Sequence, residues 1–256
     1  MKLHFKESGD SKNTTIVFLH GLLASAQNWQ GITKRLSIEY HCIALDLPNH
    51  GNSPHDDQAD YEFLVDCFEA FIEEQDIESF YLIGHSMGGK VAMLYALNHP
   101  ERIKKLVVED IAPKTYPMRF LPLMGAMDAL NLSKYKTRKE VDQALKEDVP
   151  DPLLRMFVMT NLVRDDDKHF EWRVNLKGLI ENASYIMSFP ETHQVYYDEV
   201  LFMCGEKSDY VTEKDRDIIK KYFPKANVVF FKEASHWLHA EKPQPFTEGL
   251  QHFLEQ

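Results

Sequence analysis

The feature that most constrains the fold is the alternation of short apolar runs with helical patterns along much of the chain. The runs at 15–19, 41–45 and 80–83 are apolar and rich in residues that favour strands, as expected of strands buried on both faces. The segment 61–75 between them places apolar residues on one helical face and acidic residues opposite. Strands that alternate with helices predict a mostly parallel sheet with helices on both faces.

The alternation stops at 113–195, where helix-like segments with Pro and Asp replace the strands. Strand-like runs resume at 200–203 and 228–231. We therefore expect an α/β core made of residues 1–112 and 196–256, with a helical cap inserted at 113–195. Open parallel sheets bind ligands at the carboxyl ends of their strands, so we expect the cap to cover that edge. Helices that serve only packing are the alternative.

The composition limits the possible partners. Hydrophobic residues (44%) and charged residues (27%) are in the proportions of a globular protein. The formal net charge of −11 disfavours nucleic acids and anionic membranes as partners. The three cysteines lie far apart, no apolar run approaches the roughly 20 residues of a membrane helix, and the first residues lack the apolar core of a secretion signal. We expect a cytoplasmic protein without a nucleic-acid or membrane partner.

The strongest local motif is GHSMG at 84–88, between the strand at 80–83 and a helix. G-x-S-x-G in this position is the pattern of a nucleophile elbow, a tight turn that exposes a strained serine above the sheet. Gly84 and Gly88 supply the small flanking residues that the turn needs. We predict that Ser86 is a catalytic nucleophile at a helix N-terminus, where backbone N–H groups stabilise developing negative charge. A glycine-rich turn that contains serine by chance is the alternative.

The same segment also fits a phosphate-binding motif. Residues 84–90 match G-x-x-x-x-G-K, the phosphate loop of nucleotide hydrolases. Val91 follows, where that motif needs Ser or Thr to hold magnesium, so we reject a nucleotide site. Lys90 is then expected to be an ordinary cation on the helix surface. We expect no cofactor and no metal site, since nothing resembles a zinc signature such as HExxH.

A serine nucleophile needs a base, which in this order of elements follows the last strand. His236 is the first histidine after the strand at 228–231, and we predict that it is the base. His239 is expected to be structural. His20 and His85 stand beside motif glycines, and we expect them to form hydrogen bonds at the substrate pocket rather than to transfer protons.

Two acidic residues compete to orient the base. Many such enzymes carry the acid after the strand at 200–203, but Ser208 stands at that position here and Asp209 is one residue late. Asp110 follows the strand at 105–108, which is expected to neighbour the nucleophile strand. Side chains alternate along a strand, so only one of Glu109 and Asp110 can point inward. We predict Asp110, with Asp209 as the second candidate.

The predicted oxyanion hole consists of two backbone N–H groups. Met87 supplies one, directly after the nucleophile, and Leu22 supplies the other from the loop after the strand at 15–19, where Gly21 permits close approach. Apolar cap residues could line an acyl pocket or belong to an ordinary core. They are Met118, Phe120, Met124, Phe157 and Met159.

Five segments together resemble the YbfF-type bacterial esterases of the α/β-hydrolase superfamily, which are related to mitochondrial abhydrolase-domain proteins. They are HGLLAS, DLPNHGNS, GHSMGGK, VVEDIAP and SHWLHAEKP, and the resemblance extends over nearly the whole chain, including EWRVNL at 171–176. It implies the α/β-hydrolase fold, carboxylesterase activity and, as in several members, hydrolysis of acyl-CoA thioesters. It also implies that Asp110 is the triad acid and that Trp237 lines the acyl pocket. Simple packing beside His236 is the alternative for Trp237.

The predicted reaction is therefore the hydrolysis of a small-molecule ester or acyl-CoA thioester through an acyl-enzyme on Ser86. Serine at this position argues against haloalkane dehalogenase and epoxide hydrolase chemistry, because those relatives need a carboxylate there. Two alternatives stay open. One is a different serine reaction, such as C–C bond hydrolysis or perhydrolysis, and the other is a receptor that binds a ligand without useful turnover.

Overall fold

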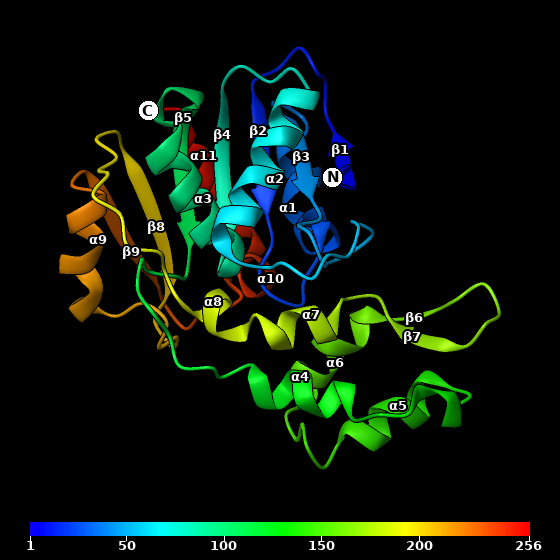
Figure 1. Ribbon diagram of the computed structural model, residues 1–256. Helices are drawn as coiled ribbons and strands as arrows, with labels where there is room; N and C mark the ends of the chain where they lie inside the picture. Colours follow the sequence, from blue (N-terminus) through cyan, green and yellow to red (C-terminus); the bar gives the residue numbers. More distant parts are fainter.

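The computed structural model describes all 256 residues and is built around one seven-stranded sheet (Figure 1). The strand order is β1-β3-β2-β4-β5-β8-β9. Only β1 runs antiparallel to its neighbour, and every other pair is parallel, which confirms the predicted mostly parallel sheet. The strands are β1 (Phe5–Ser8), β2 (Thr15–Leu19), β3 (His41–Leu45), β4 (Phe80–His85), β5 (Ile103–Glu109), β8 (Val200–Gly205) and β9 (Ala226–Phe231).

Helices cover both faces of this sheet, which is why its central strands are apolar without interruption. Successive side chains of β2 point to opposite faces, so Val17 and Leu19 join one apolar cluster while Ile16 and Phe18 join the other. One face packs against α2 (Tyr61–Glu74), α3 (Met87–Asn98) and α9 (Arg216–Tyr222). The other packs against α1 (Gln30–Leu36), α10 (Leu238–Glu241) and α11 (Pro243–Leu254).

All strands of the large sheet lie outside residues 113–195. Figure 1 shows this segment as a separate layer below the sheet, next to the ends at which β4 and β8 finish. It contains α4 (Leu121–Asp128), α5 (Arg138–Leu145), α6 (Pro152–Val158), α7 (Leu176–Glu181), α8 (Ala183–Met187) and the antiparallel strands β6 (Leu162–Arg164) and β7 (Phe170–Trp172).

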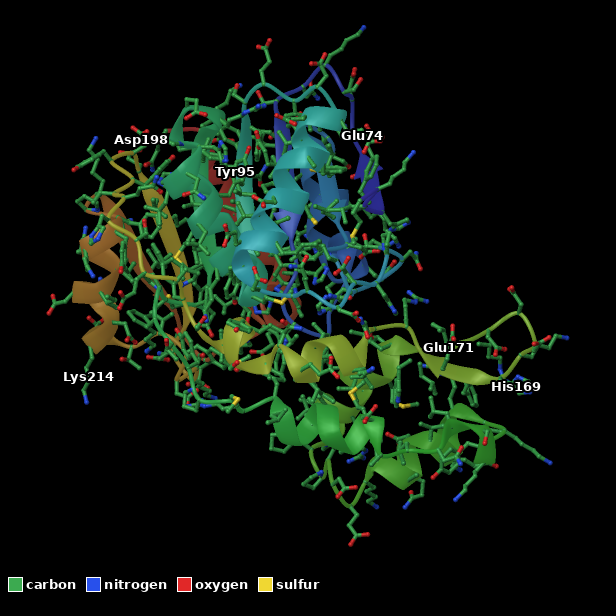
Figure 2. The ribbon with its side chains drawn as sticks, in the orientation of Figure 1. Glu74, Tyr95, His169, Glu171, Asp198 and Lys214 are labelled. Atoms are coloured by element: carbon green, nitrogen blue, oxygen red, sulfur yellow. The ribbon has the colours of Figure 1, made fainter.

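The hairpin β6–β7 departs from the expectation of a purely helical insertion. Each of its strands has only three residues, too few to produce a readable alternation in the sequence. Figure 2 shows His169 and Glu171 of this hairpin at the outer end of the layer, far from the sheet.

Short 3₁₀ helices complete the chain: η1 (Ala26–Trp29), η2 (Pro100–Arg102), η3 (Leu132–Lys134), η4 (Met159–Asn161) and η5 (Glu213–Asp215). None of the helices has the length and apolarity needed to cross a bilayer.

The buried carboxylate of Asp46 joins three parts of the fold at the end of β3. It accepts hydrogen bonds from the Ala26 N–H (2.6 Å), the Asn52 N–H (2.9 Å) and His4 Nδ1 (2.7 Å). Burial alone would raise the pKa of Asp46, but the nearby His20 and these hydrogen bonds outweigh it and lower the pKa below its usual value. The ionised carboxylate therefore stabilises the loops that follow β2 and β3.

We predict that Asp46→Ala lowers the free energy of unfolding by about 3 kcal/mol at neutral pH, because the buried Ala26 N–H and the partly buried Asn52 N–H lose a charged acceptor. The folded-state pKa of Asp46 is lowered, so its contribution is present above the unfolded pKa and is lost as the pH falls through the folded value. Urea unfolding of both proteins at neutral and acid pH measures this difference, which should shrink on acidification. Asp66→Ala, at an exposed position of α2, is the matched control. An equal effect of both substitutions would contradict the prediction.

Candidate active site

The turn between β4 and α3 holds Ser86 in a conformation that serine rarely adopts, with φ 52° and ψ −117°. A Cβ atom on Gly84 would come within 2.3 Å of the Gly88 carbonyl oxygen, and one on Gly88 within 2.5 Å of the His20 carbonyl oxygen. The turn is held by hydrogen bonds from the Ser86 N–H to the Glu109 carbonyl and from the Gly88 N–H to the His20 carbonyl, both 3.1 Å. Both glycines are therefore required by close backbone approach.

The structure brings Ser86, His236 and Asp110 together at the end of the sheet. His236 Nε2 lies 3.0 Å from Ser86 Oγ, and His236 Nδ1 lies 2.7 Å from Asp110 Oδ2. All three side chains are buried, and Asp110 has no exposed surface. Since a carboxylate can only accept, the Nδ1 proton of His236 points to Asp110, and Nε2 is left to accept the serine proton. This is the geometry of a nucleophile, its base and an orienting acid.

Asp110 is held on both of its carboxylate oxygens. Oδ1 accepts the Gly205 N–H (2.9 Å), and Oδ2 accepts the Ser208 hydroxyl in addition to His236. The Asp110 N–H donates to the Met203 carbonyl (2.9 Å). Ser208 stands at the position where the acid was first expected, and it donates to the acid instead of replacing it.

The second candidate acid lies away from the base. Asp209 is exposed, and both of its carboxylate oxygens lie 2.5 Å from Arg119 Nη1. The Arg119 guanidinium lowers the pKa of Asp209 below its usual value. Asp209 thus makes a surface ion pair with Arg119, and His236 is bonded to Asp110.

His236 is positioned by groups from other parts of the fold. The Tyr210 ring stacks on its imidazole, with ring centroids 3.8 Å apart and an interplanar angle of 18°. His85 Nε2 lies 2.8 Å from the His236 carbonyl oxygen and donates to it. Burial, together with the nearby His236 and His239, lowers the pKa of His85 well below its usual value, so this donor stays neutral.

A second buried acid–histidine pair lies behind the first. The fully buried Glu109 carboxylate accepts the His239 N–H (3.0 Å) and lies 2.9 Å from His239 Nδ1. This places His239 in the structural role expected of it. His85, Glu109 and His239 are also the one group of side chains with metal-ligating atoms close together, within 4.8 Å. In this structure Glu109 binds His239, and His85 binds the His236 carbonyl.

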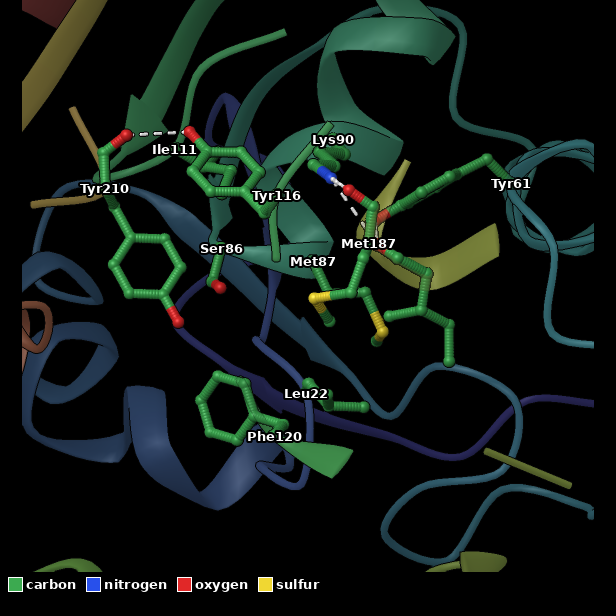
Figure 3. Close-up of a pocket in the computed structure, with 11 residues that line it drawn as sticks. Leu22, Tyr61, Ser86, Met87, Lys90, Ile111, Tyr116, Phe120, Met187 and Tyr210 are labelled. Carbon is green, nitrogen blue, oxygen red and sulfur yellow. Dashed lines mark hydrogen bonds between the residues drawn. The ribbon is translucent and has the colours of Figure 1, made fainter. Parts of the chain in front are cut away.

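The two predicted oxyanion donors, Leu22 and Met87, both line a pocket beside Ser86 (Figure 3). Met87 is the first residue of α3, so its N–H has no acceptor within the helix. The Leu22 N–H donates to no backbone carbonyl. A Cβ atom on Gly21 would lie 2.9 Å from His85 Nδ1, so glycine is needed where this loop passes the site. The role of both N–H groups stays a prediction.

The pocket beside Ser86 has an empty volume of about 290 Å³, and most of its wall is apolar. Its lining residues are Leu22, Tyr61, Ser86, Met87, Lys90, Ile111, Tyr116, Phe120, Ile186, Met187 and Tyr210. Of the cap residues named from the sequence, Phe120 is in this wall, whereas Met124 is buried in the core.

Trp237, His20 and His85 lie outside this lining. Trp237 is half-buried and packs near the Phe157 ring, with centroids 5.6 Å apart. His20 donates from Nδ1 to the Gly21 carbonyl (2.8 Å) and accepts the Leu47 N–H on Nε2 (3.0 Å). Burial lowers the pKa of His20, which keeps it neutral in that role.

Lys90 is buried rather than on the helix surface, so the expectation of an ordinary surface cation is wrong. The reason is that α3 has no solvent face: every residue from Met87 to Leu97 is buried. Lys90 Nζ donates instead to the carbonyl oxygens of Met187 (2.8 Å) and Ser188 (2.6 Å), which belong to the layer below the sheet.

Comparison with known proteins agrees with this geometry. Residues 14–243 match the family described as alpha/beta hydrolase fold. The chain is an α/β-hydrolase. The hydrolase is 35% identical to the mouse sn-1-specific diacylglycerol lipase ABHD11, over 96% of this chain and 82% of that protein. It is 30% identical to esterase YbfF of Escherichia coli, over 99% of both chains.

Among solved structures, a marine microorganism esterase superposes with a TM-score of 0.95 at 37% identity, covering 98% of the hydrolase and 99% of that chain. The resemblance to YbfF-type esterases inferred from the motifs is thereby confirmed.

We predict that Glu109→Ala lowers the free energy of unfolding of the hydrolase by about 3–5 kcal/mol, since it leaves buried His239 donors without an acceptor. Chemical unfolding followed by circular dichroism measures this loss. Glu171→Ala removes an exposed carboxylate from the hairpin seen in Figure 2 and should change stability by less than about 0.5 kcal/mol. Similar stability of both variants would refute the importance of the Glu109–His239 pair.

Proposed function

We propose that this α/β-hydrolase is a serine carboxylesterase that hydrolyses esters of short acyl groups through an acyl-enzyme on Ser86. The observation that carries the proposal is the hydrogen-bonded series Ser86–His236–Asp110, which ends in a largely apolar pocket. Its relatives support the same class, because they are named esterases and a diacylglycerol lipase.

The reaction begins when Ser86 Oγ attacks the ester carbonyl and its proton passes to His236 Nε2. Asp110 holds the imidazole in the tautomer that accepts this proton, and its charge stabilises the imidazolium. The N–H groups of Leu22 and Met87 bind the carbonyl oxygen as it becomes negative. His236 then gives its proton to the departing alcohol, which leaves the acyl group on Ser86.

Water completes the cycle by the same route in reverse. His236 removes a proton from a water molecule, whose oxygen attacks the acyl carbonyl, and the proton returns to Ser86 as the carboxylic acid leaves. The stacked ring of Tyr210 and the hydrogen bond from His85 limit the motion of the imidazole between these steps. Each proton transfer therefore runs over a contact of fixed geometry.

The size of the pocket supports short acyl groups. Its empty volume of about 290 Å³ includes space that is open to solvent, and the room for the centre of a water-sized sphere is only about 20 Å³. Apolar side chains such as Ile111, Phe120 and Ile186 favour an alkyl chain by removing its surface from water. Thioesters present the same carbonyl to Ser86, so acyl-CoA hydrolysis stays a prediction of the same mechanism.

We predict that Ser86→Ala lowers the turnover of p-nitrophenyl butyrate by about 10³-fold or more, and Asp110→Asn by about 10⁴-fold. Asp209→Asn is the matched control, because it makes the same chemical change in an exposed ion pair and should alter kcat by less than about twofold. Steady-state kinetics on purified proteins measures all three.

Covalent labelling of Ser86 with a fluorophosphonate, read by mass spectrometry, complements these kinetics. Wild type should be labelled and Ser86→Ala should not. A dead Asp209→Asn beside an active Asp110→Asn would overturn the assignment of the acid. Labelling of wild type without turnover of any ester would favour a ligand receptor instead.

We also predict a chain-length preference. In a series of p-nitrophenyl esters and acyl-CoAs, kcat/KM should be highest for short acyl groups and fall for long ones by about tenfold or more, because long chains do not fit the narrow pocket. A rise in kcat/KM up to the longest chains would show that the pocket does not limit the substrate.

A further inference from the structure

Lys90 is a buried cation that no anion neutralises. Its side chain is 2% exposed, and no carboxylate lies within ion-pair distance of its amine. Nζ instead contacts three successive carbonyl oxygens, those of Ile186 (3.4 Å), Met187 (2.8 Å) and Ser188 (2.6 Å). Burying an ammonium group is costly unless such partners are held in place for it. An apolar side chain would fill this site at a lower cost, so the buried amine indicates a specific role for Lys90.

The three carbonyls belong to the C-terminal end of α8, where a helix has acceptors without intrahelical donors. A cation at this end also complements the helix dipole. Two other groups hold the same turn: the Tyr61 hydroxyl donates to the Ile186 carbonyl (2.7 Å), and the Tyr116 N–H donates to the Met187 carbonyl (2.9 Å). Lys90 is the central member of this set, because it reaches all three carbonyls.

The turn that Lys90 holds is also a wall of the substrate pocket. Ile186 and Met187 line the pocket, and Figure 3 shows Met187 between Lys90 and the space beside Ser86. Lys90 lies four residues after Ser86 on α3, and its own N–H donates to the Ser86 carbonyl (3.1 Å). One helix thus carries the nucleophile at its start and, one turn later, the amine that positions the opposite wall.

We propose that Lys90 is a specificity-determining residue, which limits the length of the acyl group by clamping the carbonyls of residues 186–188 against α3. This inference rests on the proposed esterase function. With the clamp closed, Ile186 and Met187 end the pocket. With the clamp open, the end of α8 moves outward and a longer chain fits.

The charge of Lys90 makes this clamp sensitive to pH. Burial lowers the pKa of Lys90 to about 7, so the amine loses its proton within the neutral range. The titratable groups that face it are the phenols of Tyr61 and Tyr116, whose rings lie 5.5 and 4.9 Å away and whose pKa values are raised by burial. Lys114, on the Tyr116 ring, is paired with Asp215 at 2.5 Å. A neutral amine donates fewer and weaker hydrogen bonds.

The test is the ratio of kcat/KM for p-nitrophenyl decanoate to that for p-nitrophenyl butyrate, measured from about pH 6 to about pH 8.5. Any effect of pH on the chemical steps that both esters share applies to both alike and cancels in this ratio. In wild type the ratio should be low at acid pH and rise as Lys90 loses its proton. Lys90→Met keeps an unbranched side chain of similar length without donors, and should raise the ratio at pH 6 by at least about tenfold and make it independent of pH.

Lys114→Met is the matched control, since it removes a cation from the same tyrosine ring without opening the clamp, and its ratio should follow that of wild type. A Lys90→Met ratio equal to wild type at every pH would overturn the inference. If Lys90→Met does not fold, Tyr61→Phe and the wild-type pH series decide: Tyr61→Phe should raise the ratio by a smaller factor, and a flat wild-type series would overturn the inference.

Failure of the proposed function gives a different result, because wild type would then cleave neither ester. The clamp itself is still testable in that case by amide hydrogen exchange of residues 183–188. Amide exchange in this segment should be faster in Lys90→Met than in wild type. Raising the pH should accelerate exchange more in wild type than in Lys90→Met, which shows only the intrinsic pH dependence of exchange. Equal protection of this segment in both proteins would refute the clamp.

Discussion

The close contact of three backbone segments at the start of α3 is the constraint on which the site depends. Ser86 occupies a φ of 52°, a conformation that costs roughly 1–3 kcal/mol and persists only where the surroundings impose it. Here the carbonyls of His20 and Glu109 accept hydrogen bonds from the turn, and the absence of side chains on Gly84 and Gly88 lets the segments touch. The same contacts bring the loop of Leu22 and the end of β5 to Ser86, so one turn positions the candidate nucleophile, the predicted oxyanion donors and the candidate acid.

Two adjacent acidic residues at the end of β5 hold two different histidines. Glu109 is the last residue of β5 and Asp110 follows it. Glu109 holds His239 of α10, and Asp110 holds His236 in the loop before α10. Asp110 also adopts a positive φ of 50°. The segment that follows β9 is therefore held at two points beside the end of β5. That double attachment gives the imidazole of His236 a defined place although it belongs to a loop.

Much of the fold and of the candidate site could be predicted from the sequence, because these features follow from local sequence patterns. The strands are continuous apolar runs, the elbow has its two glycines, and Asp110 follows a strand that the parallel order places beside Ser86. The features that could not be predicted from the sequence depend on tertiary packing. Lys90 looks like a surface residue until α8 covers α3, and Ser208 gains its partner only when β5 and β8 lie side by side. Three-residue strands such as β6 leave no period to detect.

Residues 113–195 supply part of the pocket wall but none of the hydrogen-bonded groups around Ser86. Hydrogen bonds join Ser86, Asp110, Ser208 and His236, which all lie outside residues 113–195. The pocket wall combines residues of that same part of the chain, such as Ile111, with Phe120, Ile186 and Met187 from within 113–195. Drift in the inserted layer can therefore alter which molecule is accepted while the chemistry is inherited intact. Related enzymes with this arrangement can change substrate preference by single substitutions in the pocket wall and remain active at each step.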